Sequence, residues 1–503
     1  MTKRKKRNAI TLVSLLLALA ALIGVYVWYS NKPAKDNSDT ATSTIDLATV
    51  DTTKLSSLHY IKDDADITLV QKDDSWISQD EPDRPINQDY VKAILTAIND
   101  IKADRVIMEK PDNLADYGLA EPVASLQATM TDGTTVTVKI GNATSDSKGY
   151  YGMVNDDGKV YLLPVEMGSA LQYNNTQMTA VITGPEITAA NISHITITNR
   201  DGQDFDLNYI DDKSLDNTGN NLYSWNIIKP YGKGYTADST KVSDLQSNYT
   251  TFTYTSCVDY KGEDLSKYGL DDPAASIYVG YYTTTTEALP TPETDPTTGE
   301  SITEKTTYDN HDYKVFVGNK DADGNYYVRI DGSNAVYTIS ADSIDKMLQV
   351  DAFSILNPYV LIPNIDTVDK IVFDIAGTTY TMDIKRTAQK NSDGTDETVA
   401  TYYYNGNEVK EDSFKSLYQQ MISAQYDTEI KDTVSTDGVA PYMSMSFHIF
   451  GDNERTISAS FLPYNDSFYI VQKDGETRFF VDKKKIDAIA AAVSQFTDST
   501  TTQ

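Results

Sequence analysis

The segment Asn319-Lys-Asp-Ala-Asp-Gly324 carries side chains that could bind a calcium ion. Asn319, Asp321 and Asp323 place oxygen atoms at the first, third and fifth positions of a calcium-binding loop, and Gly324 stands at the sixth. The acid that such a loop needs at its last position is replaced by Ile330, which has no donor atom. A hairpin turn is therefore the favoured interpretation, and calcium binding at low affinity is the alternative.

Other patterns that support catalysis or cofactor binding are missing from the sequence. The four histidines are never spaced as metal ligands on one helix, and the chain contains no nucleophile elbow and no phosphate-binding loop. With 73 acidic residues, neighbouring carboxylates carry little information about a glycosidase-type pair. We therefore predict no catalytic residue, no cofactor and a non-enzymatic protein, with an envelope hydrolase as the least favoured alternative. The histidines are His59, His194, His311 and His448.

The composition limits the partners of the chain. The formal net charge is -30, although the basic cluster Lys3-Arg-Lys-Lys-Arg7 is positive. A surface this acidic repels phosphate backbones, so nucleic acid is excluded as a partner. The single cysteine, Cys257, rules out an intrachain disulfide, and its Tyr- and Thr-rich surroundings predict a buried residue on a strand.

An apolar segment follows the basic N-terminus. Residues Ala9–Tyr29 carry no charge, and as a helix they would be about 31 Å long, which matches the hydrocarbon core of a bilayer. Because a cleaved signal peptide has a shorter apolar region, an uncleaved transmembrane anchor is favoured over a cleaved signal. Residues 1–8 would then be a cytoplasmic tail, residues 30–47 a flexible stalk, and the remainder would lie outside the cell membrane.

An internal repeat organises the rest of the chain. Tyr117-Gly-Leu-Ala-Glu-Pro122 returns as Tyr268-Gly-Leu-Asp-Asp-Pro273, and a tryptophan precedes each copy by 41 and 43 residues. We interpret the motif as structural, with glycine in a conformation closed to other residues, leucine in the core and proline at the start of a strand. Its residues are Trp76, Tyr117, Gly118, Leu119 and Pro122, repeated as Trp225, Tyr268, Gly269, Leu270 and Pro273.

The repeat predicts an α+β fold with three units at 48–185, 186–357 and 358–503, of which the last is divergent. Each unit is expected to be a mainly antiparallel sheet with one main helix. Asn87 and Asp238 are candidate caps of the first two helices. The second copy contains extra residues, and they are assigned to a mobile insertion at about 283–310 because this stretch is rich in Thr, Glu and Pro.

The order of these landmarks resembles a bacterial family, the domain-of-unknown-function family 4340. The second repeat carries the resemblance most fully, through Trp225, Pro230, Asp238, the Tyr268–Pro273 motif and Gly318. Membership would imply a single-span envelope protein encoded beside transporters similar to gliding-motility exporters. The resemblance thus implies an accessory or binding subunit beside the permease and ATPase components of an ABC-type transporter, with no catalytic residues to transfer. The alternative is a structural or adhesion protein of the cell envelope.

Overall fold

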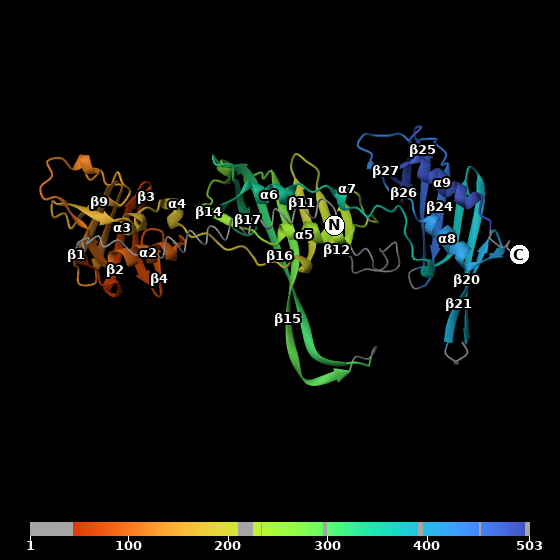
Figure 1. Cartoon of the computed structure of the whole chain (residues 1–503), viewed down its shortest axis with the longest axis horizontal. Helices are drawn as coiled ribbons and strands as arrows, with labels where there is room; N and C mark the ends of the chain where they lie inside the picture. The colour runs from red at the N-terminus through yellow and green to blue at the C-terminus, as the bar shows by residue number, and fades with distance from the viewer. Residues whose placement is uncertain are drawn as a thin grey trace, which may run out of the picture. The chain divides into compact units, whose positions relative to one another are not determined.

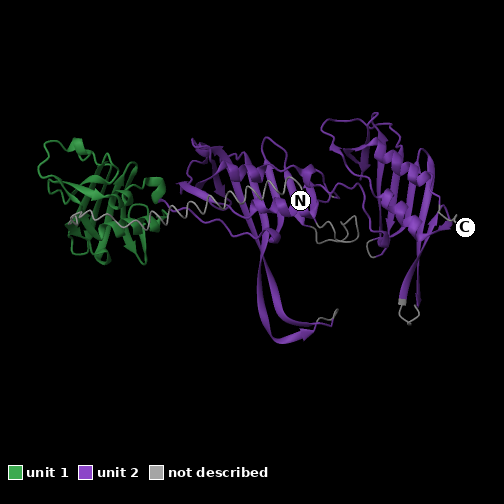
Figure 2. Cartoon of the chain, viewed as in Figure 1, with its two compact units in different colours: residues 1–178 green, residues 179–503 purple. Residues whose placement is uncertain are grey.

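The computed structural model describes residues 44–209, 225–232, 234–294, 299–390, 396–451 and 454–497. The chain forms two compact units, Met1–Met178 and Thr179–Gln503 (Figure 2). The first unit contains one large sheet and a two-stranded sheet, and the second contains two large sheets. The predicted antiparallel, α+β character is confirmed, since the strands of every sheet pair in antiparallel fashion and a few helices accompany them (Figure 1).

The large sheet of the first unit has eight strands. Its spatial order is β4 (Ser75–Ser78), β3 (Ala65–Lys72), β2 (Leu55–Lys62), β7 (Ala124–Met130), β8 (Thr135–Ala143), β9 (Gly149–Val154), β10 (Val160–Pro164) and β6 (Arg105–Met108). Alternating burial along β2 and β7 gives the sheet one apolar face. The β7–β8 connection turns at Gly133, whose φ of 84° is readily adopted by glycine.

Helix α2 (Gln88–Ile98) belongs to the same core as this apolar face. The side chain of Asn87 accepts a hydrogen bond from the backbone N–H of Tyr90, which satisfies one of the free donors at the helix start. Val91, Ile94 and Ile98 recur at helical spacing and are buried with the sheet. The predicted helix and its cap are confirmed. Two shorter helices, α3 (Val165–Ala170) and α4 (Asn175–Met178), complete the unit.

The first sheet of the second unit repeats the strand order of the first unit. It reads β13 (Trp225–Lys229), β12 (Phe205–Tyr209), β11 (Ile192–Asn199), β15 (Ala275–Thr294), β16 (Ser301–Lys320), β17 (Tyr326–Ile330), β18 (Val336–Ile339) and β14 (Tyr254–Asp259). In both sheets the strand at the far edge, β6 or β14, is the fourth strand of that sheet in sequence order. Helix α5 (Ser239–Gln246) begins at Asp238, whose side chain accepts from the N–H groups of Thr240 and Lys241, as predicted.

The last sheet has the same order with one extra edge strand. It reads β22 (Asn407–Val409), β21 (Asp396–Tyr404), β20 (Thr378–Lys390), β19 (Val368–Ile375), β24 (Met443–Ile449), β25 (Arg455–Pro463), β26 (Phe468–Lys473), β27 (Glu476–Asp482) and β23 (Thr428–Glu429). Two helices of similar length, α8 (Glu411–Met421) and α9 (Lys483–Ser494), accompany it. The prediction of one main helix is therefore wrong here, because α9 also contributes buried apolar side chains to the core.

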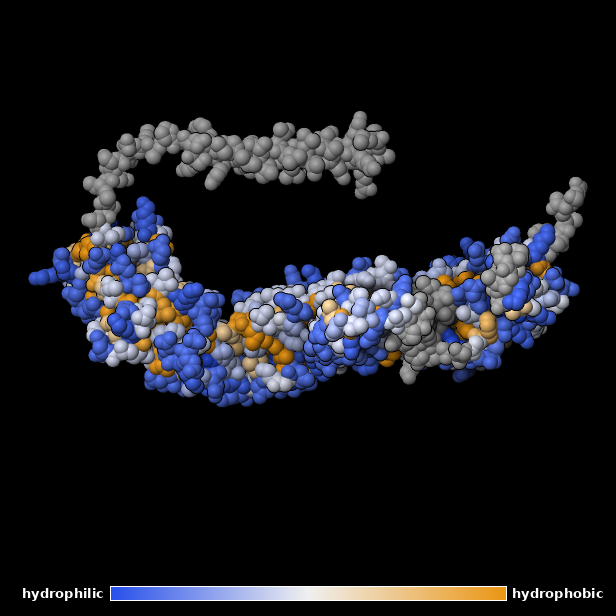
Figure 3. Space-filling view, turned by 90° about the horizontal axis from the view of Figure 1, so that it is seen from below, coloured by the Kyte–Doolittle hydropathy of each residue, from blue (hydrophilic) through white to orange (hydrophobic). Residues whose placement is uncertain are grey.

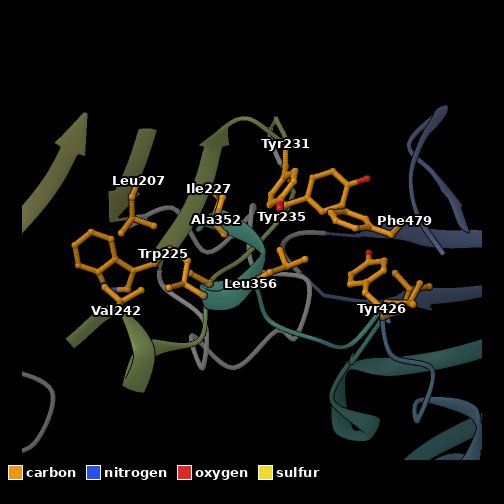
Figure 4. Close-up of a cluster of buried hydrophobic side chains, with 14 of the residues drawn as sticks. Leu207, Trp225, Ile227, Tyr231, Tyr235, Val242, Ala352, Leu356, Tyr426 and Phe479 are labelled. Carbon is orange, nitrogen blue, oxygen red and sulfur yellow. The ribbon is translucent and has the colours of Figure 1, made fainter. Parts of the chain in front are cut away.

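The two sheets of the second unit share one continuous apolar core. Side chains from both sheets belong to it, together with α6 (Ala341–Leu348), α7 (Ala352–Ile355) and the chain that follows. Tyr231 and Tyr235, which follow β13 in the first of these two sheets, lie against Phe479 of β27 in the other (Figure 4). Their ring centroids are 5.0 and 5.5 Å, respectively, from that of Phe479. Burial of these rings fixes the junction between the two modules.

The N-terminal predictions have different outcomes. The anchor Ala9–Tyr29 and most of the stalk lie outside the described residues. Within the described ranges no helix is long and apolar enough to cross a membrane. The predicted end of the stalk at residue 47 is wrong, because residues 45–47 already belong to strand β1 (Ile45–Thr49), which pairs with β5 (Asp100–Ala103). Leu47 and Ala48 pack against the core of the first unit, which holds this strand in place.

Candidate functional site

The two Tyr-Gly-Leu segments adopt the same conformation. Each ends a short 3-10 helix, Leu114–Tyr117 in the first unit and Leu265–Tyr268 in the second. The glycines that follow have φ values of 70° and 67°, in the left-handed region that favours glycine. The N–H of Leu119 donates to the carbonyl oxygen of Leu114, and the N–H of Leu270 to that of Leu265, both at 3.0 Å.

Each Tyr-Gly-Leu turn makes a close backbone contact with a strand of its own sheet, β8 in the first unit and β16 in the second. A Cβ atom at Gly141 of β8 would lie 2.2 Å from the carbonyl oxygen of Tyr117, and one at Gly318 of β16 would lie 2.2 Å from that of Tyr268. No side chain fits into this gap, so the strand must carry glycine there. The asparagines that follow these glycines, Asn142 and Asn319, lie directly against the glycine of the turn.

The motif leucines fill small clusters rather than the main cores. Leu119 packs with Met153 and Val160, and Leu270 packs with Tyr268 and Val336, in clusters separate from those that hold the helices. The expectation that each leucine is buried in apolar surroundings is confirmed, and the structure adds that these surroundings are separate from the main cores. The motif tyrosines cover these clusters through edge-on contacts, Tyr117 with Tyr151 and Tyr268 with Tyr327.

The remaining motif residues also have structural surroundings. Trp76 and Trp225 are buried in the main cores. The backbone of Trp76 is further held by Gln88, which accepts from its N–H at 2.9 Å and donates to its carbonyl at 2.8 Å. Pro122 and Pro273 precede the strands β7 and β15. The motif thus forms a structural clasp in each module and brings no reactive groups together.

The calcium candidates serve the turn between β16 and β17. Asn319 lies against Gly269, as described above. The carboxylate of Asp321 accepts hydrogen bonds from the backbone N–H groups of Asp323 and Asn325, at 3.0 and 2.8 Å. Asn325 Nδ2 also donates to Asp321 at 3.2 Å. Asp321 is therefore engaged in stabilising a hairpin turn.

The histidines are dispersed, and three of them pair with acids. His59 contacts Asp66 at 2.8 Å, His194 contacts Asp206 at 2.9 Å, and His448 contacts Asp369 at 2.6 Å. The hydrogen bond to Asp369 raises the pKa of His448 above its ordinary value. Across the described ranges, no three His, Cys, Asp or Glu side chains are grouped so that they could hold a metal ion.

The most unusual surface element is a long ribbon formed by β15 and β16. Both strands have 20 residues, and they stay paired from Ala275↔Val317 to Thr294↔Ser301 with one irregularity after Ala288. The predicted insertion at 283–310 is thus the outer part of this ribbon, which extends well beyond the sheet (Figure 1). Its Thr-rich sequence suits a two-stranded ribbon, because threonine favours extended backbone.

The outer ribbon has two edges that no described strand covers. Strand β11 pairs with β15 only as far as Tyr281, and β17 pairs with β16 only from Val315 onward. The backbone groups that face away from the partner strand, along 282–294 and 301–313, therefore resemble the open edge of a sheet. Residues 283–288 and 303–312 are exposed on both faces of the ribbon.

The ribbon side chains form local contacts and carry acidic charge. Tyr282 and Tyr308 meet edge-on at 5.5 Å, and Tyr308 remains 64% exposed. The hydroxyls of Thr286 and Thr306 lie 3.0 Å apart. In the described part of the outer ribbon, acidic side chains outnumber the single lysine, Lys305. The acidic residues are Glu287, Glu293, Glu300, Glu304, Asp309 and Asp312. Such a surface suits a polar or basic partner better than an apolar one.

The first unit shows what the same hairpin looks like without the extension. There β7 and β8 have 7 and 9 residues and close at the border of the sheet. The fold therefore does not require the ribbon. The surface drawn in Figure 3 is largely hydrophilic, with hydrophobic residues in separate patches. We take the outer ribbon as the candidate interaction site.

Comparison with known proteins identifies the family. The family model described as "Domain of unknown function (DUF4340)" matches residues 76–222 and 225–438. The chain belongs to this family. The two DUF4340 matches begin at the motif tryptophans, Trp76 and Trp225. The second match extends from the sheet that starts the second unit into the last sheet of the chain. Searches of curated proteins and of solved structures found no match.

The clasp interpretation predicts a matched pair of stability losses. Leu119→Ala and Leu270→Ala should each lower the free energy of unfolding of their own unit by about 2–5 kcal/mol, because each empties a buried position. Thermal and urea unfolding of the single variants would measure the losses. Tyr464→Phe, on a residue that is 46% exposed, serves as the control and should leave stability unchanged. Losses near zero for both leucines would contradict the clasp.

Proposed function

We propose that this protein is a membrane-anchored, extracytoplasmic binding subunit that captures a protein partner through the outer part of the β15–β16 ribbon. It works as a non-enzymatic accessory of an ABC-type transporter. The observation that supports partner binding is the ribbon itself, and the transporter assignment rests on the resemblance described above.

The energetics of the ribbon favour a binding role. An isolated two-stranded hairpin is marginally stable in water, since it orders many residues without burying them. The outer ribbon is exposed on both faces within its own chain. A partner strand that paired with either edge would supply backbone hydrogen bonds and cover side chains of one face. The ribbon therefore gains more by docking on a partner than by standing alone.

The location follows from the N-terminal sequence. The apolar segment Ala9–Tyr29 has the length of a membrane span, and the basic residues before it favour the cytoplasmic side. We place residues 44–503 outside the membrane on this basis. The common strand order also leads us to assign the sheet of residues 368–482 as a third, diverged copy of the repeated module.

Shortening the ribbon should abolish partner capture while leaving the fold intact. Thr283 and Asp309 are opposite each other, so residues 284–308 can be replaced by Asn-Gly to close the hairpin with a tight turn. After cross-linking in native membranes and affinity purification, the shortened variant should recover at least about tenfold less partner than the parent chain. A tenfold lower affinity corresponds to a loss of roughly 1.4 kcal/mol of binding free energy.

The matching control makes the same change in another hairpin. Ala388 and Thr398 are also opposite each other, so an Asn-Gly turn can replace residues 389–397. This control should capture partner like the parent chain, and both variants should keep the parent's thermal transition. Undiminished capture by the shortened ribbon would refute the proposed site.

Removing Met1–Tyr29 tests the anchor separately. The truncated chain should stay in the supernatant after high-speed centrifugation of lysed cells, because the remaining sequence is acidic and hydrophilic. The full chain should sediment with the membranes and be released only by detergent. A truncated product that remained with the membrane fraction would show that other residues attach it.

A further inference from the structure

The two faces of the outer ribbon differ in composition. Successive side chains of a strand alternate between faces, so the register of β15 and β16 assigns each residue to one of them. The face that carries Tyr282 and Tyr308, called the Tyr308 face, consists of the opposed pairs Gly280↔Asp312, Tyr282↔Asn310, Thr284↔Tyr308, Thr286↔Thr306 and Ala288↔Glu304. The opposite face consists of Tyr281↔His311, Thr283↔Asp309, Thr285↔Thr307 and Glu287↔Lys305.

The Tyr308 face is negative and has no compensating cation. Its charged residues are Glu304 and Asp312, and no lysine or arginine lies on it between those two positions. The hydroxyl of Tyr278 donates to Asp312 and holds this carboxylate at the base of the ribbon. On the opposite face Lys305 lies directly across from Glu287, so these two charges offset each other. A cationic partner is therefore attracted chiefly to the Tyr308 face.

Tyr308 provides the aromatic surface of this face. It is 64% exposed, the highest value among the large hydrophobic side chains of the described residues. Tyr282 supports it edge-on, with the ring centroids 5.5 Å apart. Tyrosine adds a large contact area at a low cost in side-chain entropy, and it is common among the residues that dominate binding energy. Tyr308 is thus suited to anchor a partner.

Other strand tyrosines of the chain show how a cation reaches such a ring. Lys320 of β16 lies directly opposite Tyr326 of β17, and its Nζ is 4.5 Å from the ring centroid. Lys385 of β20 reaches the ring of Tyr403 on β21 at the same distance. Among the residues that the structure describes, no lysine or arginine lies over Tyr308. A basic side chain on a strand beside Tyr308 would contact its ring in the same way.

The open edge of β16 gives a partner strand access to these groups. Because β17 pairs with β16 only from Val315 onward, residues 301–313 keep an edge that no described strand covers. A strand added to this edge would place every second side chain on the Tyr308 face, at about 5 Å from its neighbour on β16. Basic residues at alternate positions of that strand would lie beside Tyr308 and near Glu304.

We infer, resting on the proposed function, that the partner contributes a strand with lysine or arginine at alternate positions, which pairs with the β16 edge and binds the Tyr308 face. One cation would stack on the ring of Tyr308, and a second would form a charged hydrogen bond with Glu304. The backbone hydrogen bonds of the added strand would supply affinity, and these side chains would select a basic sequence.

Binding of a synthetic peptide to the full chain in detergent tests this inference. The probe is a short, fluorescently labelled peptide of alternating arginine and threonine, and a peptide of alternating glutamate and threonine is its negative control. Fluorescence anisotropy at physiological salt should show binding of the basic peptide only. Tyr308→Leu, which keeps apolar volume but removes the ring, and Glu304→Gln should each weaken this binding about threefold.

Asp309→Asn is the matched control variant. It removes a carboxylate next to Tyr308 in the sequence, as Glu304→Gln removes one nearby, but it does so on the opposite face. Its affinity for the basic peptide should stay close to that of the parent chain. All three variants should keep the parent's thermal transition, because the altered side chains are exposed. Equal weakening by Asp309→Asn and Glu304→Gln, or parent-like binding by Tyr308→Leu, would overturn the inference.

Capture of the native partner separates this inference from the proposed function. In the cross-linking assay, a chain carrying both Tyr308→Leu and Glu304→Gln should recover about tenfold less partner than the parent chain. If shortening the ribbon abolishes capture and the double variant does not, the Tyr308 face is refuted and the ribbon remains the site. If neither change lowers capture, both the Tyr308 face and the proposed function are wrong.

Discussion

The structure depends on a backbone contact that only glycine permits. In each of the first two modules, the carbonyl oxygen of the motif tyrosine lies only 2.2 Å from where a Cβ atom would stand at Gly141 or Gly318. This contact holds the 3-10 turn against the strand, and the turn then covers a small apolar cluster with its leucine and tyrosine. The larger core, with its helix, belongs to a separate cluster, so each module buries apolar residues in two places.

Much of this arrangement could be predicted from the sequence, because local signals and long-range packing agree. Asn87 and Asp238 cap their helices as their positions suggest, and the recurrence of the Tyr-Gly-Leu motif corresponds to the same turn in both modules. What could not be predicted depends on tertiary contacts. The motif leucines look like ordinary core residues, and only the fold shows that they fill separate clusters. Ile45 and Leu47 follow a polar stretch, and their strand forms because β5 offers an edge.

The ribbon shows a different limit of sequence analysis. A segment rich in threonine, glutamate and proline resembles a loop, yet continuing the register of β15 and β16 gives it regular pairing. The small cavity at the junction of the second and third modules was also beyond sequence analysis, since Lys473, Tyr426 and Leu356 are brought together only by the packing of two modules. In our account the modules form a stable body, and the ribbon is the part left available for a partner.

Hydrogen exchange of the ribbon amides gives the most direct test of that account. Exchange at residues 284–294 and 299–308 would be compared between the full chain in its native membrane and the same chain purified alone, with β24 and β25 as the internal reference. The account predicts exchange at least about tenfold slower in the membrane for the ribbon alone, because a bound partner would protect the outward-facing amides of its edge strands. Equal exchange rates in the two samples would contradict it.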